Sequence, residues 1–193
     1  SDPQLRALVG HVQFHHDLPR PPLDPTAAPP PRQPSGGACR ERHIIERDAF
    51  LKNVLLENEL PGDVPLKARE YKIQYTTPRL AFLVKIDQTE EVDCLEIVSN
   101  LFPDKRTSFV LAMDEETIVL LTDFPKEDPE FIDRTAATIM DTINAESLAK
   151  VRIGIGMVAE SLKDAAKSYR EASLALTVGN IFESDTYVMR YDK

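Results

Sequence analysis

The chain has 193 residues, of which 42% are apolar and 28% are charged, a composition typical of a folded globular protein. Acidic residues outnumber basic residues by 32 to 23, and the net charge of −9 argues against a general nucleic-acid-binding surface. We find no apolar run of membrane-spanning length and no secretory signal, and the two cysteines, Cys39 and Cys94, fit neither a disulfide framework nor a zinc site. We therefore expect a cytoplasmic protein without a membrane partner.

Residues 1–40 differ in composition from the rest of the chain. They hold nine of the fifteen prolines, grouped at 19–22 and 29–31, and Ser35-Gly-Gly37 follows. Such a stretch cannot pair into a regular sheet and has few apolar side chains to bury. We predict a disordered or non-native tail, with a short amphipathic segment at 5–12. A linker, an added segment and an aberrant N-terminus remain alternatives for its origin.

Three histidines in this tail invite a metal-binding interpretation. On a helix, His11 and His15 would share a face, as a zinc pair requires, and His16 is adjacent. No cysteine or carboxylate at a fixed spacing completes the set. We interpret these histidines as surface residues, and we do not assign the prolines to a binding partner.

A helix is predicted at 41–60. Apolar residues recur at helical spacing, charged residues fill the other face, and Pro61-Gly62 ends the run. Its apolar stripe consists of Ile44, Ile45, Phe50, Leu51, Val54 and Leu55. Two interpretations are open. The helix packs on its own domain, or it dimerises and transmits a signal between domains.

Strands and helices then alternate along the chain. The first strand is a nearly continuous apolar run, and the next helix is predicted to be capped by Thr89, with Glu90 and Glu91 in its first turn. Asp128-Pro129 predicts the start of the second helix, and Ser161 with Asp164 forms a capping-box pattern at the start of the third. The predicted elements are a strand at 80–86, a helix at 90–102, strands at 107–113 and 117–122, a helix at 129–143, a strand at 150–155, a helix from 161 to a C-terminal turn at Gly179-Asn180, and a strand at 187–190.

This order predicts an α+β fold with a ferredoxin-like βαββαβ core, an extra C-terminal helix and strand, and a preceding helix. We expect helices to cover one face of a mixed sheet. The predicted organisation is a tail at 1–40, a connecting or dimerisation helix at 41–60 and the folded domain at 61–193.

Several segments resemble one family. The folded domain is similar to a GGDEF-like domain, and more closely to the GGDEF-like middle domain of the sugar-diacid (CdaR/PucR-type) transcriptional regulators. The resemblance covers about residues 42–193. It rests on Val151-Arg-Ile-Gly-Ile-Gly156, on 161–176 and Gly179-Asn-Ile-Phe182, and more weakly on Asn100–Lys105, Pro78-Arg79 and the helix at 50–60. Such regulators also carry a diacid-recognition domain and a helix-turn-helix domain. Residues 1–40 do not resemble the former, and we expect the latter to lie beyond Lys193.

The resemblance also implies a test for catalysis. Active diguanylate cyclases need a glycine pair in the central hairpin, where backbone approaches the nucleotide, and carboxylates for Mg²⁺. The matching residues here are Ala112-Met113-Asp114-Glu115-Glu116, so both glycines are missing. On the first strand Lys85 occupies the expected position of a metal ligand, with Asp87 as an alternative. We interpret the acidic residues as a solvated turn.

A rival motif is Gly154-Ile-Gly156-Met-Val-Ala159, which matches the dinucleotide fingerprint G-x-G-x-x-A. In that fingerprint the helix begins at the glycines, whereas here the predicted cap, Ser161, comes later. We interpret these glycines as allowing close helix packing against a buried strand.

We therefore expect a non-catalytic regulatory and dimerisation module of a CdaR-type regulator, with no catalytic, cofactor-binding or metal-binding residues. The expected partners are a second copy of the chain and, through other domains, DNA and a small-molecule effector. The alternatives are a degenerate nucleotide- or metabolite-binding domain and, last, an active nucleotide cyclase.

Overall fold

The computed structural model describes residues 22, 25–31, 36–87, 93–182 and 187–193. The chain divides into two units, Ser1–Pro34 and Ser35–Lys193. Among the residues described in the first unit, none lies in a helix or strand. The three tail histidines and the amphipathic segment at 5–12 lie outside the described residues.

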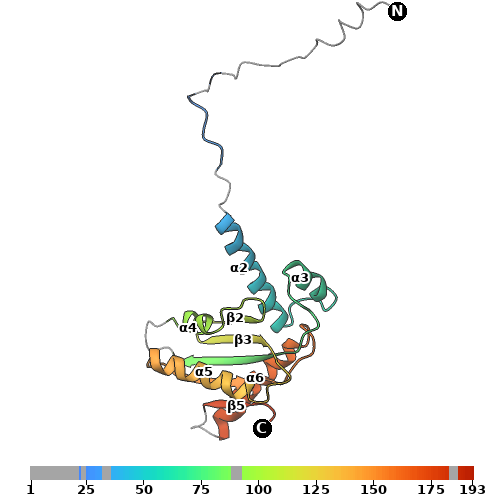
Figure 1. The fold of residues 1–193 in the computed structure, drawn as a ribbon, viewed down its shortest axis with the longest axis vertical. Helices are drawn as coiled ribbons and strands as arrows, with labels where there is room; N and C mark the ends of the chain where they lie inside the picture. Colours follow the sequence, from blue (N-terminus) through green and yellow to red (C-terminus); the bar gives the residue numbers. More distant parts are fainter. Residues whose placement is uncertain (1–21, 23–24, 32–35, 88–92, 183–186) are drawn as a thin grey trace, which may run out of the picture. The chain divides into compact units, whose positions relative to one another are not determined.

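The second unit is built on a five-stranded sheet with the order β2-β3-β1-β4-β5 (Figure 1). All neighbouring strands are antiparallel except β4 and β5, which are parallel. This is the ferredoxin-like arrangement with one added strand, so the predicted fold class is confirmed. The elements are α2 (Gly36–Leu55), α3 (Val64–Glu70), β1 (Arg79–Asp87), α4 (Cys94–Leu101), β2 (Ser108–Ala112), β3 (Thr117–Asp123), α5 (Phe131–Glu146), β4 (Lys150–Ile155), α6 (Ala165–Phe182) and β5 (Val188–Arg190).

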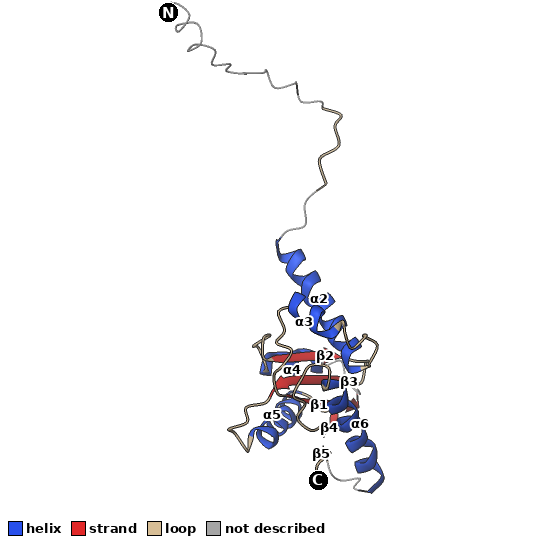
Figure 2. Ribbon diagram, turned by 90° about the vertical axis from the view of Figure 1, so that its right-hand side faces the viewer, coloured by secondary structure: helices blue, strands red, loops and turns tan. Residues whose placement is uncertain are grey.

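Helices cover both faces of this sheet, whereas we expected them on one. Because side chains alternate along a strand, β1 contributes to two separate cores. Leu80 and Phe82 pack with residues of α4 and α5, and Ala81 and Leu83 pack with residues of α2 and α6. Figure 2 shows α5 and α6 on opposite sides of the stacked strands. The continuous apolar run of β1 is the sequence feature that matches burial on both faces.

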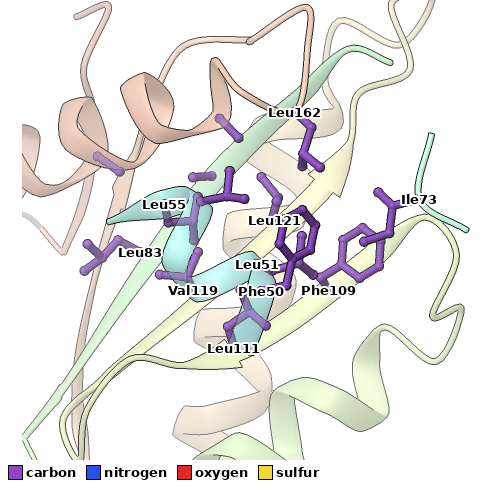
Figure 3. Close-up of a cluster of buried hydrophobic side chains, with 14 of the residues drawn as sticks. Phe50, Leu51, Leu55, Ile73, Leu83, Phe109, Leu111, Val119, Leu121 and Leu162 are labelled. Carbon is purple, nitrogen blue, oxygen red and sulfur yellow. The ribbon is translucent and has the colours of Figure 1, made fainter. Parts of the chain in front are cut away.

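Four of the six residues in the apolar stripe of α2 lie in the second of these cores. Phe50, Leu51, Val54 and Leu55 are each no more than 4% exposed. They lie across the strands next to Phe109 and Leu121 of β2 and β3 (Figure 3). The C-terminal half of the helix therefore packs on its own domain, as the first of the two interpretations held.

The other half of α2 is exposed. Every residue from Gly36 to Glu46 is exposed, including Ile44 at 42% and Ile45 at 68%. Among the described residues, α2 begins at Gly36 rather than near 41, and it ends at Leu55 rather than near 60. We did not predict α3, although Pro65 in its first turn is a helix-start signal.

Other helix ends differ from the sequence expectation by one turn. The side chain of Asp93 accepts a hydrogen bond from the Glu96 N–H and caps α4, whereas Thr89, Glu90 and Glu91 lie outside the described residues. Ser161 and Asp164 do pair, at 3.0 Å between Oγ and Oδ2, but in a turn that precedes α6.

The start of β1 carries a buried ion pair. The Arg79 side chain is 1% exposed, and its Nε lies 3.2 Å from Asp123 Oδ1 across the β1–β3 ladder. Burial lowers the pKa of Arg79 and raises the pKa of Asp123, because it disfavours both charges. Arg79 Nη2 also donates to the Gln74 carbonyl at 2.5 Å, which ties the preceding loop to the sheet.

The α6 helix lies unusually close to β4, because two residues of that surface are glycines. A Cβ on Gly154 would lie 2.2 Å from the Ala172 carbonyl oxygen, and a Cβ on Gly156 would lie 2.0 Å from the Ser168 carbonyl oxygen. No side chain fits there without moving the helix. The interpretation of these glycines as packing residues is confirmed.

We expect Gly156→Ala to destabilise the domain by about 3 kcal/mol, because the added methyl group meets helix backbone that cannot rotate away. Urea unfolding followed by circular dichroism measures the change. Gly62→Ala is the matched control, since a Cβ there has no atom within 4 Å, and it should change stability by less than about 0.5 kcal/mol. Equal stability of the two variants would contradict the close packing.

The same close approach creates a helix-to-strand hydrogen bond. Ser168 Oγ accepts the Ala81 backbone N–H at 2.9 Å in the buried interior. Ser168→Ala leaves that N–H without this partner, at an expected cost of about 1 to 3 kcal/mol. Thermal unfolding of this variant is compared with that of Ser173→Ala, an exposed position on the same helix. A loss no larger than that of Ser173→Ala would show that the bond contributes nothing.

Candidate functional site

The acidic turn between β2 and β3 closes one end of the central hairpin. The Met113 N–H donates to the Thr117 carbonyl at 2.9 Å, and the Glu116 N–H donates to Asp114 Oδ1 at 2.8 Å. The bond from Glu116 is the main reason that the pKa of Asp114 lies below its usual value. Asp114, Glu115 and Glu116 are all exposed. Asp114 therefore stays ionised, and its carboxylate is used to form its own turn.

Side chains stand where a catalytic hairpin would have glycines. Ala112 is half-buried at the end of β2. Met113 is also half-buried and packs against the core beneath α2 and α6. The backbone at these two residues is therefore screened by its own side chains, and close approach of a nucleotide at this point is hindered.

Lys85 lies on β1, the central strand of the sheet, close to the C-terminal end of that strand. In the strand register it is opposite Thr117 of β3 on one side and opposite Arg152 of β4 on the other. Lys85 Nζ is 3.4 Å from Thr117 Oγ1 and 3.8 Å from a carboxylate oxygen of Glu116, and the side chain is 41% exposed. The position where we expected a metal ligand thus carries a partly exposed cation.

Arg152 is the second cation at this end of the sheet. Its Nη1 donates a hydrogen bond to Asn180 Oδ1 of α6. Within the described part of the chain, no carboxylate oxygen lies within 4 Å of its guanidinium group, the distance that defines the ion pairs elsewhere in the domain. Arg152 and Lys85 are therefore two like charges placed directly opposite each other on neighbouring strands.

These residues line a cleft of about 370 Å³ between the sheet and α6. Its lining is polar and is completed by a row of side chains from the helix. The lining residues are Leu83, Lys85, Asp114, Thr117, Arg152, Tyr169, Ser173, Leu176, Thr177 and Asn180. Burial, and then the charge of Asp114, raise the pKa of Tyr169, so its phenol is protonated at neutral pH and can donate a hydrogen bond.

The alternative metal ligand, Asp87, lies at the end of β1 opposite Lys150. It lines a neighbouring hollow with Glu116, and Lys85 and Arg152 line that hollow too. Within the described residues, His, Cys, Asp and Glu side chains nowhere form a group of three or more that could hold a metal ion. Asp87 and Glu116 thus share a hollow with two cations, and no third such side chain joins them among the described residues.

The dinucleotide-type motif does not form a phosphate site. Gly154 and Gly156 face the backbone of α6, and that helix begins only at Ala165. Its N-terminus therefore does not start at the glycines, as phosphate binding by this motif requires. Gly179, which we expected in a C-terminal turn, lies within α6, where a Cβ would overlap the Met189 sulfur.

Sequence reasoning named Lys85 and Asp114 but missed the rest of the polar lining. The signal was present on the last helix, where Tyr169, Ser173 and Thr177 recur at intervals of four and so share a face. Arg152 was visible as a charged residue between the buried Val151 and Ile153 of a strand.

A family model described as a GGDEF-like domain matches residues 57–178. The matched segment extends from the end of α2 through most of α6 and includes nearly all of the cleft lining. No curated protein matches the chain. Among the helices that the structure describes, none has the length and apolar character needed to cross a membrane.

Proposed function

The chain belongs to the GGDEF-like domain family, and from this premise we propose that it is a non-catalytic regulatory and dimerisation module of a CdaR/PucR-type transcriptional regulator. In this proposal the module connects a ligand-sensing domain to a helix-turn-helix domain, and DNA contact belongs to the latter. The resemblance of residues 151–182 to that group of regulators supports the specific assignment.

The pair of cations in the cleft, Lys85 and Arg152, is the observation that supports the proposal that the module is non-catalytic. Two-metal or one-metal phosphoryl chemistry needs carboxylates to hold the ion against the phosphates. Here Lys85 and Arg152 repel a divalent cation, and Asp114 is engaged with the Glu116 N–H. The side chains of Ala112 and Met113 add a steric barrier at the hairpin.

We expect no cyclic dinucleotide when the chain is incubated with GTP and either Mg²⁺ or Mn²⁺, because the described residues form no group of three or more potential ligands for the ion. Chromatography of the products against a boiled sample measures this, with an active diguanylate cyclase as positive control. Product that disappears in the Asp114→Ala variant would contradict the proposal.

The dimerisation part of the proposal concerns the exposed half of α2. Four of the six residues of the apolar stripe are not available for self-association, since they are no more than 4% exposed in the core, and Leu51 is 0% exposed. Ile44 and Ile45 remain, on a stretch of helix that makes the connection toward the preceding chain. A helix that leaves apolar residues exposed in this way is stabilised when a second copy covers them.

The anchored half of α2 couples this helix to the domain. The Arg47 guanidinium carbon lies 5.2 Å from the centre of the Phe109 ring, a cation–π contact with β2. Beyond the end of the helix, Glu57 forms an ion pair with Arg170 of α6. A change in how two α2 helices pair would therefore act directly on β2 and α6.

We expect sedimentation velocity at micromolar concentration to give a dimer that the double substitution Ile44→Asp with Ile45→Asp weakens by about tenfold or more, because two charges replace the apolar contact. Leu66→Asp is the matched control, since Leu66 also lies on a helix and is as exposed as Ile45, at 68%. A wild-type monomer at every concentration, or equal weakening by the control, would rule out this surface.

A further inference from the structure

We propose that the cleft between the sheet and α6 binds a small organic anion directly, through Lys85 and Arg152 and without a divalent metal. The shared chemistry of the ligand is a phosphate or carboxylate head group attached to a hydroxyl-bearing body. This inference deepens the proposed regulatory function, because such a ligand would act as an effector of the module itself.

The first reason is electrostatic. Like charges directly opposite each other on neighbouring strands destabilise a sheet. Lys85 and Arg152 are such a pair, and both side chains point to the α6 side of the sheet, where they line the same cleft. Asp114 is the one carboxylate among the lining residues and is bonded within its own turn, and Glu116, in the adjoining hollow, lies 3.8 Å from Lys85 and is 62% exposed. Lys85 thus has one exposed carboxylate partner at long range, and Arg152 has none within 4 Å among the described residues, so an anion seated between the two cations would neutralise charge that these carboxylates leave uncompensated.

The second reason is the hydrogen-bonding character of the opposite wall. Tyr169, Ser173 and Thr177 line this wall from consecutive turns of α6. The Thr177 hydroxyl donates to the Ser173 carbonyl at 3.1 Å, so the donors that this wall offers to an anion are the hydroxyls of Tyr169 and Ser173. Because the Tyr169 phenol keeps its proton at neutral pH, it can donate to an anion or to a ligand hydroxyl. Hydrogen bonds from cations to a phosphate or carboxylate are about twice as strong as neutral ones.

The third reason is that the site is built on rigid elements. Its cations extend from two paired strands, and Arg152 is further oriented by its hydrogen bond to Asn180. The volume of about 370 Å³ lies within the range of about 300 to 1,000 Å³ typical of small-molecule sites. The chain as a whole carries a net charge of −9, so the cleft is a local positive region on an acidic molecule.

The test is an amide NMR titration of the whole chain in EDTA at constant ionic strength. Inorganic phosphate and malonate are the two head-group probes. Glycerol 3-phosphate and glycerol alone test the contribution of a hydroxyl-bearing body with and without a head group. We expect saturable shifts at residues of β1, β4 and α6 that line the cleft, tighter binding of glycerol 3-phosphate than of phosphate, and none for glycerol. Whichever head group binds more tightly identifies the source of the anion.

Two variants make the result decisive. Arg152→Gln and Lys85→Gln should each weaken binding by about tenfold to a hundredfold, whereas Arg152→Lys should retain part of it, because it keeps the charge. Lys126→Gln is the matched control: it removes a surface lysine beyond the opposite end of β3, where Lys126 pairs with Glu160. The unliganded spectrum of each variant reports whether it is folded.

Unchanged binding in both glutamine variants, shifts that map elsewhere, or no saturable shift with any probe would overturn the anion site. Binding that requires added Mg²⁺ would overturn it as well and would favour a metal–nucleotide cleft. These failures are separable from failure of the proposed function, which product formation from GTP and the sedimentation data test independently.

Discussion

The close approach of α6 to β4 is the constraint on which the rest of this domain depends. Arg152 and Gly154 of β4, with Gly156 just after the end of the strand, lie on the side of the sheet that α6 covers. The two glycines let the helix backbone lie against the strand, near enough for Ser168 to accept the Ala81 N–H. The arginine reaches the helix only through its side chain, at Asn180. One row of three residues thus sets both the tight packing at one end and the cleft at the other.

The same row supplies one of the two cations of the cleft. Arg152 lies between the buried residues Val151 and Ile153, and its cross-strand neighbour is Lys85. The nearby carboxylates of Asp114 and Glu116 belong to the hairpin turn, where Asp114 accepts a backbone N–H. A cleft with opposed cations and hydroxyl groups favours an anion that needs no metal. The two proposals, that the module is not a cyclase and that its cleft binds an anion, therefore rest on the same pair of cations.

The two halves of the α2 helix lie in different surroundings. Its C-terminal half closes one core with Phe50 and Leu51, and its N-terminal half exposes Ile44 and Ile45. Arg47 of this helix contacts Phe109 of β2, and Glu57, two residues beyond the end of the helix, pairs with Arg170 of α6.

The sequence by itself determined the order of the elements from β1 onward, the ferredoxin-like topology and the missing glycines at Ala112 and Met113, but we did not predict α3 from it. These properties depend on local patterns, because periodicity, caps and turn residues act within a few positions of each other. It also limited Gly154 and Gly156 to a packing role, since the following helix starts too late to bind phosphate there.

Only the tertiary structure decided which helix covers which face, and hence that Phe50, Leu51, Val54 and Leu55 of the α2 stripe are buried in their own domain. The continuous apolar run of β1 is compatible with two buried faces, but we expected helices on one face only, and the run does not say that α2 and α6 share a face. The cleft was equally out of reach, because it brings together Lys85, Arg152 and Tyr169 from three separate elements. The strand register and the close approach of α6 to Gly154 and Gly156 bring these three side chains together. Neither the register nor that approach can be predicted from a local stretch of sequence.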